Sequence, residues 1–138
     1  MSGKQVQQVT AGEWDVITFY GYDERSGQVY YSSSAKSTLE EHIYAKGLKK
    51  RSFNQLTERK GQHSADFSEG FKYFIDYHTD ANTPYYITLK SGRGKTIRVL
   101  EDNARLNATL ASYDLQPKEF FTFTNSEGID LNCWMIKP

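Results

Sequence analysis

An internal repeat is the feature of this sequence that most constrains its fold. Residues 28–58 and 72–102 follow the same pattern, and Ile43 in the first copy lies 44 positions before its equivalent, Ile87. Each copy predicts a strand, a short loop, a strand, a turn and a strand, with its apolar residues in register. Short strands in a repeat of about 40–45 residues are typical of β-propeller blades. Propellers close with about 4–8 blades, and this chain has room for two, so we expect it to be a piece of a larger protein. The other equivalent apolar positions are Val29-Tyr30-Tyr31 with Tyr73-Phe74-Ile75, Phe53 with Ile97, and Leu56 with Leu100.

The sequence before each copy of the repeat adds a fourth strand. Residues 14–22 are rich in β-branched and aromatic residues, and a turn follows them; residues 64–67 are also followed by a turn. Aromatic residues make up 14% of the chain, and they favour strands. We therefore predict a mainly β fold with two four-stranded antiparallel β-propeller blades, followed by one short helix and a β-hairpin. The predicted blade strands are 14–22, 28–33, 42–45 and 52–57, and then 64–67, 72–78, 85–90 and 95–100.

The spacing of apolar residues changes after residue 102. Asn103 is a good N-cap, and apolar residues at helical spacing follow it before Pro117. These are Leu106, Leu110 and Tyr113. We predict a helix at 103–112 and then a hairpin whose strands, 119–124 and 129–136, are joined by a polar turn. The helix and hairpin belong to neither copy of the repeat, so we expect a domain boundary near residue 103.

The charge balance and the lack of long apolar segments exclude some classes of function. The chain has 17 Lys and Arg residues and 17 Asp and Glu residues, so its formal net charge is zero. Binding of nucleic acid over a broad surface needs a basic excess, and we predict no nucleic-acid partner. No run approaches the about 18 apolar residues that mark a membrane-spanning helix, so we predict no membrane span. Residues 1–12 are polar, without an apolar signal segment, and are either the remnant of a tag or the tail of a preceding strand.

Metal and cofactor sites are not expected. The three histidines, His42, His63 and His78, are far apart in the sequence and have no metal-ligand spacing. His42 and His78 lie in or beside predicted strands, where we interpret them as solvated or hydrogen-bonded side chains. Cys133 is the only cysteine, so no disulfide can form within the chain. Its apolar neighbours favour a buried, unreactive thiol.

Short motifs that match catalytic or phosphate-binding sites have structural explanations. Gly94-Lys95-Thr96 is similar to the end of a phosphate-binding loop, but Leu89 occupies the position of a required glycine and a strand follows, so we predict a hairpin turn. Ser33-Ser34-Ala35-Lys36 fits the S-x-x-K motif without its helix or partner motifs. Glu40-Glu41 is a carboxylate pair whose side chains point apart, and we interpret it as part of a solvated loop. No G-x-S-x-G motif occurs, and we assign no catalytic, cofactor-binding or metal-binding residue.

Paired aromatic residues could form a stacking platform for single-stranded nucleic acid. Tyr30-Tyr31 and Tyr85-Tyr86 are such pairs, but a platform also needs a cationic groove, which zero net charge does not supply. We interpret both pairs as packing between blades.

Four separated segments of the chain can be compared with known families: Gly12-Glu13-Trp14-Asp15-Val16, Val29-Tyr30-Tyr31-Ser32-Ser33, Arg98-Val99-Leu100-Glu101-Asp102-Asn103 and Trp134-Met135-Ile136-Lys137-Pro138. In this order they resemble the dipeptidyl peptidase IV group of the prolyl oligopeptidase family, and its bacterial members most. In that family an eight-bladed propeller precedes an α/β-hydrolase domain. The resemblance implies that residues 9–102 form the last two blades. It also implies that residues 103–138 form a linker helix and the first strands of a truncated hydrolase domain.

The same resemblance implies a peptidase in which this segment is not catalytic. Family members are serine peptidases that release dipeptides from free N-termini, with proline or alanine at the second position. Their Ser-Asp-His triad lies on the hydrolase domain, and a glutamate pair early in the propeller binds the substrate ammonium group. Neither motif falls within this chain. Glu40-Glu41 stands in the context of a late blade, so no site residue is carried over. The parent protein would be periplasmic or secreted.

We therefore expect a non-catalytic fragment that completes the propeller and joins it to the catalytic domain. Its partners would be the rest of the propeller, the hydrolase domain and, in the whole protein, peptide substrates. Alone, it would expose blade faces and unpaired strand edges, and we expect it to self-associate, with exchange of the hairpin 119–138 as one route. The alternative is a free-standing β-rich protein-interaction module.

Overall fold

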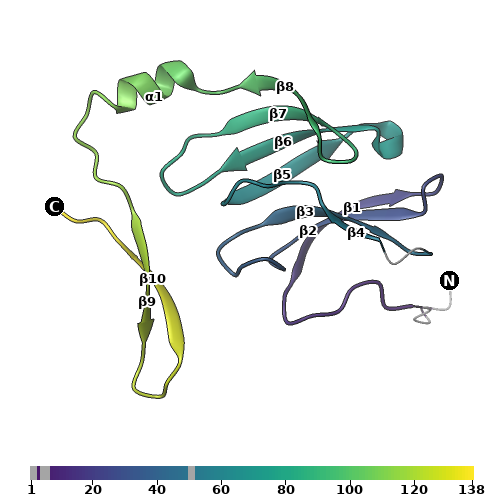
Figure 1. Ribbon diagram of the computed structural model, residues 1–138, viewed down its shortest axis with the longest axis horizontal. Coiled ribbons are helices and arrows are strands. Elements are labelled where there is room, and N and C mark those ends of the chain that lie inside the picture. Colours follow the sequence, from purple (N-terminus) through teal and green to yellow (C-terminus); the bar gives the residue numbers. More distant parts are fainter. Residues whose placement is uncertain (1–2, 4–6, 50–51) are drawn as a thin grey trace.

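Two four-stranded antiparallel sheets, a short α-helix and a separate hairpin make up most of the part of the chain that the structure describes (Figure 1). The structure is a computed structural model that describes residues 3, 7–49 and 52–138. The first sheet contains β1 (Val16–Asp23), β2 (Gln28–Ser33), β3 (His42–Gly47) and β4 (Phe53–Gln55). The second contains β5 (Gln62–Phe67), β6 (Tyr73–Thr79), β7 (Tyr86–Ser91) and β8 (Thr96–Glu101), with a short 3-10 helix, η1 (Glu69–Phe71), after its first strand. Helix α1 (Ala104–Leu110) and the hairpin strands β9 (Glu119–Thr124) and β10 (Asp130–Met135) follow.

Each sheet is a meander in which strands that are consecutive in the chain pair with one another. The strand orders are β1-β2-β3-β4 and β5-β6-β7-β8. The sequence repeat corresponds to this topology, because Ile43 and Ile87 both lie in the third strand of their sheet. The prediction of two four-stranded β-propeller blades followed by one helix and a hairpin is therefore confirmed, and we call the two sheets the first and second blade. The predicted strand at 52–57 is shorter in the structure, and parts of the segments 1–12 and 46–50 lie outside the described residues.

The two blades share one hydrophobic core at the seam between them. Its buried side chains are Tyr30, Ile43, Ala45 and Leu56 from the first blade, and Ala65 and Phe74 from the second. Phe71 stacks on Tyr30, with ring centroids 4.6 Å apart. The packing between blades predicted for Tyr30 is confirmed. Tyr31 points to the opposite face of β2, because side chains alternate along a strand, and it stacks on Trp14 there.

A hairpin turn joins β7 and β8 at the segment that is similar to a phosphate-binding loop. The N–H of Ser91 donates to the carbonyl of Lys95 (2.9 Å), and the N–H of Gly94 donates to the carbonyl of Ser91 (2.8 Å). Gly94 has a φ of 87°, and a Cβ atom there would lie 2.7 Å from the carbonyl oxygen of Leu56. Glycine is needed both for this backbone conformation and for the close approach of the two blades. The predicted hairpin turn is confirmed.

Helix α1 is shorter than predicted and begins differently. It ends at Leu110 rather than at residue 112. Asn103 does precede the helix, but the prediction that its side chain caps it is wrong. Asn103 has a left-handed backbone, with a φ of 54°, and its Nδ2 donates to the carbonyl of Tyr85. Asp102 supplies the cap, since its Oδ1 accepts the N–H of Ala104 (2.9 Å). Among the described residues, no helix is long and apolar enough to cross a membrane.

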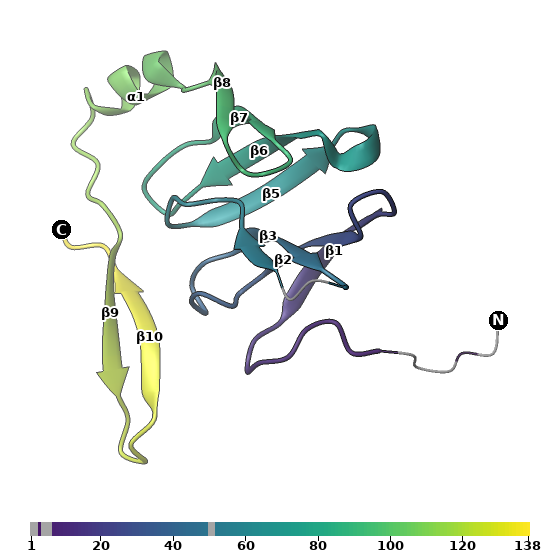
Figure 2. The ribbon, with the colours of Figure 1, turned by 45° about the vertical axis from the view of Figure 1, so that its right-hand side comes forward.

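The β9–β10 hairpin stands apart from the blade core and is tied to the blades by side-chain hydrogen bonds (Figures 1 and 2). Asn132 Nδ2 donates to Thr38 Oγ1 (3.1 Å), and the side chain of Asn82 binds the backbone of Lys118 through two hydrogen bonds. Cys133 in β10 is only partly buried. The prediction of a buried thiol is wrong. The apolar neighbours of Cys133 are typical of a core segment, but the hairpin that carries them lies outside the core of the blades.

Candidate functional site

The three histidines that are far apart in the sequence form one buried column across the seam. The ring centroids of His42 and His63 are 5.2 Å apart, and those of His63 and His78 are 4.7 Å apart. Each of the three residues is at most 3% exposed. Of the two environments predicted for His42 and His78, solvated or hydrogen-bonded, the second is the one observed. We call His42, His63 and His78 the histidine column.

The pairing of the strands brings the three histidines of the column together. His63 in β5 and His78 in β6 are direct partners in the antiparallel ladder. A parallel bridge between Glu41 and Gln62 brings the start of β3 next to the start of β5, which sets His42 against His63. The column therefore connects three strands that belong to two blades.

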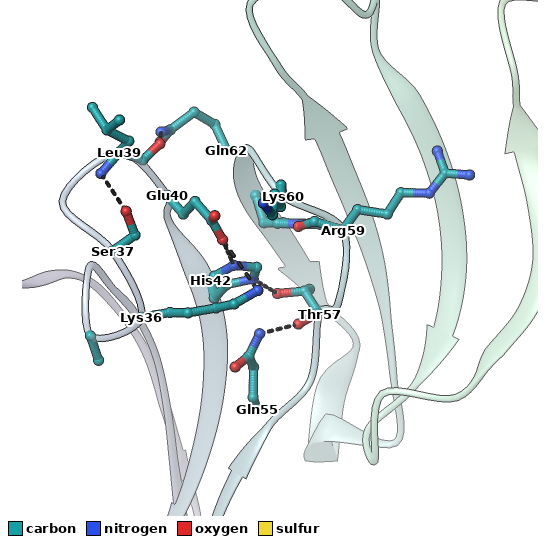
Figure 3. Close-up of polar contacts among 12 residues, drawn as sticks. Lys36, Ser37, Leu39, Glu40, His42, Gln55, Thr57, Arg59, Lys60 and Gln62 are labelled. Atoms are coloured by element: carbon teal, nitrogen blue, oxygen red, sulfur yellow. Dashed lines mark hydrogen bonds and ion pairs between the residues drawn. The ribbon is translucent and has the colours of Figure 1, made fainter. Parts of the chain in front are cut away.

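Burial favours the neutral form of His42, and both of its ring nitrogens have hydrogen-bond partners (Figure 3). Its Nε2 lies 2.7 Å from Glu40 Oε2, and its Nδ1 lies 3.0 Å from Thr57 Oγ1. The Thr57 oxygen also accepts the N–H of Ile43 (3.1 Å). With the Thr57 hydroxyl proton donated to Nδ1, the Thr57 hydroxyl group and both ring nitrogens of His42 have partners, and the ring proton lies on Nε2. Burial lowers the pKa of His42, and the hydrogen bond to Glu40 opposes that shift.

The side chains of Glu40 and Glu41 have hydrogen-bond and ion-pair partners at the seam. The prediction that they belong to a solvated loop is wrong. Glu40 accepts from the His42 ring and lies 3.2 Å from the Lys36 ammonium group (Figure 3). The hydrogen bond from His42 is the main cause of the lowered pKa of Glu40. Glu41 accepts a hydrogen bond from Ser32 Oγ (2.5 Å). Both glutamates are partly buried, and the two carboxylates have separate partners.

The centre of the column is tied to a buried ion pair. His63 Nδ1 lies 2.8 Å from Asp76 Oδ1, and its Nε2 lies 2.9 Å from the carbonyl oxygen of Arg59. Lys90 Nζ lies 3.7 Å from the other carboxylate oxygen of Asp76. Asp76 is 3% exposed, so its charge is balanced by these partners rather than by water.

The geometry of the histidine column suits a structural joint rather than a catalytic group. A catalytic histidine needs a nucleophile or a substrate proton within reach, and Thr57, the hydroxyl bonded to His42, is fully buried. A protein zinc site uses at least three protein ligands, and within the described part of the chain no group of three His, Cys, Asp or Glu side chains could hold a metal ion. The column therefore joins the two blades through a ring contact between His42 and His63 and through hydrogen bonds to the segment between the blades.

A cavity of about 730 Å³ opens at the same seam, on the side of the shared hydrophobic core. Its volume is within the range of small-molecule pockets, about 300–1,000 Å³. Charged side chains and three aromatic rings line it, among them Asp23, Arg25, Arg93, Tyr30, Phe53 and Phe71. None of its described lining residues is a histidine or a cysteine, so the cavity does not combine with the histidine column into one site.

The other residues that the sequence suggests as possible functional groups lie outside the histidine column. Ser33 is fully buried in β2, and Lys36 pairs with a carboxylate rather than with this serine, so the S-x-x-K match has no chemical meaning here. Tyr85 is 55% exposed in this chain and does not lie between its two blades. Tyr86 lies under the guanidinium group of Arg59, which is 3.8 Å from its ring centroid.

No sequence motif points to Asp76, Lys90 or Thr57. One signal could have found the first of these. In β6, Phe74, Asp76 and His78 lie on one face, so a face that carries a core phenylalanine also carries two polar groups. Polar groups on a core face need hydrogen-bond partners, but those partners lie on neighbouring strands and cannot be identified within one strand.

Comparison with known proteins agrees with this arrangement of blades, helix and hairpin. Residues 1–85 match the family described as dipeptidyl peptidase IV (DPP IV) N-terminal region. The crystal structure of Porphyromonas gingivalis dipeptidyl peptidase 4 is similar over 99% of this chain and 19% of that chain, with a TM-score of 0.91 and 34% identity. A probable dipeptidyl peptidase 4 of Aspergillus flavus is 25% identical over 100% of this chain and 18% of its own length. A probable dipeptidyl-aminopeptidase B of Emericella nidulans is 27% identical over 94% of this chain and 15% of its own length. The chain spans less than a fifth of the length of each of these relatives.

Proposed function

Because the chain belongs to the dipeptidyl peptidase IV N-terminal family, we propose that it completes the propeller of a serine dipeptidyl peptidase and joins that propeller to the catalytic domain. In this proposal, residues 9–102 are the last two blades. Residues 103–138 are the linker helix and the first strands of an α/β-hydrolase domain. The segment contributes no catalytic residue, and its role is to hold the ring together and to fix the catalytic domain against it.

The observation that carries this proposal is the likeness to one solved peptidase over nearly the whole chain. That likeness extends over the helix and the hairpin as well as both blades. A scaffolding role is further supported by the seam, because its hydrophobic core, its ion pair and its histidine column all come from side chains of this chain.

For the whole protein, we propose the release of Xaa-Pro and Xaa-Ala dipeptides from peptide N-termini by a Ser-Asp-His triad. Support comes from the relatives, which are dipeptidyl peptidases or dipeptidyl-aminopeptidases. The triad would lie in the larger part of the protein, outside this chain. Peptides would be partners of the whole protein, while the partners of this segment would be the neighbouring blades and the hydrolase domain. We propose a periplasmic or secreted location for the parent.

The first test is to sequence the gene through the codon for Pro138 and to assay the whole product. We expect a reading frame that continues to G-x-S-x-G and then to an aspartate and a histidine. The product should release p-nitroaniline from Gly-Pro-p-nitroanilide and from Ala-Ala-p-nitroanilide. The same compounds with an acetylated N-terminus should not react, because the proposed activity needs a free ammonium group.

Two results of this assay would overturn the proposal. Activity that survives replacement of the G-x-S-x-G serine by alanine would come from another peptidase or another mechanism. A stop codon directly after Pro138, with no peptidase activity in the product, would favour the free-standing β-rich interaction module instead.

A further inference from the structure

A second cavity, of about 160 Å³, lies beside the histidine column on the face of the second blade. Polar side chains of two paired strands line it: Asp76 and His78 on β6, and Thr88 and Lys90 on β7. Asp76 and Thr88 are direct partners in the ladder. Because residues two apart on a strand lie on the same face, these four side chains all point to the same side of the blade.

Two buried polar atoms at this cavity have no hydrogen-bond partner among the described residues. They are Nδ1 of His78 and Oγ1 of Thr88, on residues that are 3% and 4% exposed. The other nitrogen of His78, Nε2, lies 2.8 Å from the carbonyl oxygen of Lys60. A carbonyl only accepts, so Nε2 carries the proton, and Nδ1 of the neutral ring is an acceptor that needs a donor. Buried polar groups without partners are rare because each one costs free energy.

The charge and size of the cavity limit which kind of ligand can donate a hydrogen bond to Nδ1 of His78. Asp76 is already balanced by His63 and Lys90, and Glu58 and Arg59, which also line the cavity, carry opposite charges. The lining therefore carries charges of both signs, so the size of the cavity is what limits the ligand. The cavity is smaller than the about 300 Å³ at which pockets for organic ligands begin, but it has room for several water molecules of about 30 Å³ each.

We propose that this cavity is a binding site for ordered water. One water donates to Nδ1 of His78, and one bonds with the hydroxyl group of Thr88. These waters connect β6 and β7 with the segment between the blades, whose Arg59 and Lys60 carbonyls already bind His63 and His78. Water is thus a structural component of the seam, in addition to the proposed scaffolding role of the chain.

A high-resolution crystal structure of the whole protein tests this proposal without any substitution. We expect a water within hydrogen-bonding distance, about 2.7–3.2 Å, of Nδ1 of His78, and a water at the same distance from Oγ1 of Thr88. A dry cavity would overturn the proposal. So would an anomalous signal from a metal ion, or density for an organic molecule.

A pair of variants then tests the role of the hydroxyl group. In Thr88→Val, the water at position 88 should be lost, because valine has a similar shape but no hydroxyl. Thr88→Ser is the matched control and should keep that water, and the water at His78 should remain in both variants. A water that stays at position 88 in Thr88→Val would show that the hydroxyl does not bind it. The readout is electron density, so it does not depend on whether the protein is a peptidase.

The protonation of His78 gives an independent check in solution. NMR of the ¹⁵N-histidine-labelled whole protein, with His78→Gln to assign the signals, reports which ring nitrogen carries the proton. We expect the proton on Nε2 and an accepting Nδ1. A proton on Nδ1 would contradict the proposed donation from water to this atom, because Nδ1 could then only donate.

Discussion

Single residues at the seam differ from surface residues in how their charges are balanced. Asp76 is 3% exposed and depends on His63 and Lys90. Glu119 and Lys137 also form an ion pair, but their side chains are 50% and 60% exposed. Water and salt screen the exposed pair, and such pairs contribute about 0–1 kcal/mol. Removing one partner of a buried pair leaves an uncompensated charge away from bulk solvent.

Replacing Asp76 by alanine should therefore lower the free energy of unfolding by about 3–5 kcal/mol. His63 would lose an acceptor, and Lys90 would lose its counter-charge. Glu119→Ala is the matched control, and it should cost less than about 1 kcal/mol. Urea denaturation of the two variants and the unaltered chain measures both effects. Equal losses in the two variants would contradict a structural role for the buried ion pair.

The pH dependence of stability should reflect the neutral state of His42. Burial lowers the pKa of His42 in the folded chain below its ordinary value of 6.5. Above 6.5, the ring is neutral in the folded and the unfolded chain, so it adds no pH dependence. Below that value, the unfolded chain takes up a proton that the folded chain resists, and stability falls. Glu40 acts at lower pH: its pKa is lowered from 4.5, so the stability that it contributes is lost as the pH falls through its folded pKa.

The free energy of unfolding, measured from about pH 7.5 down to about pH 5, tests the contribution of His42. Stability of the unaltered chain should decrease across this range, and the decrease should be smaller in His42→Gln, because glutamine keeps hydrogen-bonding groups but does not titrate. An unchanged pH dependence in the variant would assign the effect to other groups.

The sequence predicts that His42 and His78 lie in or beside strands, but it does not predict that the three histidines meet. Their contact depends on the pairing of β5 with β6 and on the bridge between Glu41 and Gln62. Neither is visible in the spacing of residues along one segment. Asn103 was misjudged for a similar reason, since its side chain binds a distant carbonyl rather than its own helix.

At the scale of strands, the sequence predicted the blades well because each blade is a local structure. Strands that are consecutive in the chain are neighbours in the sheet, so turn residues and apolar alternation are sufficient to place them. Strand ends were less predictable. β4 ends at Gln55, and Leu56 and Thr57 after it are buried although they lie outside the strand, because they pack at the seam.

The core shared by the blades should make them unfold together. Phe74 is 1% exposed and belongs to a cluster of buried side chains from both blades. Phe74→Ala should lower the free energy of unfolding by about 3–5 kcal/mol while the transition remains single. Phe53→Ala is the matched control, and it should cost much less because Phe53 is 50% exposed. Thermal denaturation followed by circular dichroism measures both, and a second transition in Phe74→Ala would show that the blades are independent units.

At the scale of the whole chain, the β9–β10 hairpin has one apolar face and one mixed face. The strand register places Phe121, Phe123, Leu131 and Met135 on the same face, and these residues are 42%, 56%, 45% and 38% exposed. The other face carries Asn132, which binds the first blade. An exposed apolar face of this kind marks a contact surface. In the proposed whole protein, the rest of the hydrolase domain would cover it.

The isolated 138-residue chain should therefore self-associate. Two hairpins can pack these faces together or exchange places between copies, and in both cases apolar area is removed from water. We expect the mass measured by light scattering to rise with protein concentration to at least that of a dimer.

The double variant Phe123→Ser, Leu131→Ser should stay monomeric to higher concentrations. Tyr113→Ser removes an aromatic side chain that is 63% exposed but lies outside this face, and it should behave as the unaltered chain. A monodisperse monomer at high concentration would contradict the prediction. Association that the double variant leaves unchanged would place the contact at the unpaired strand edges of the blades instead.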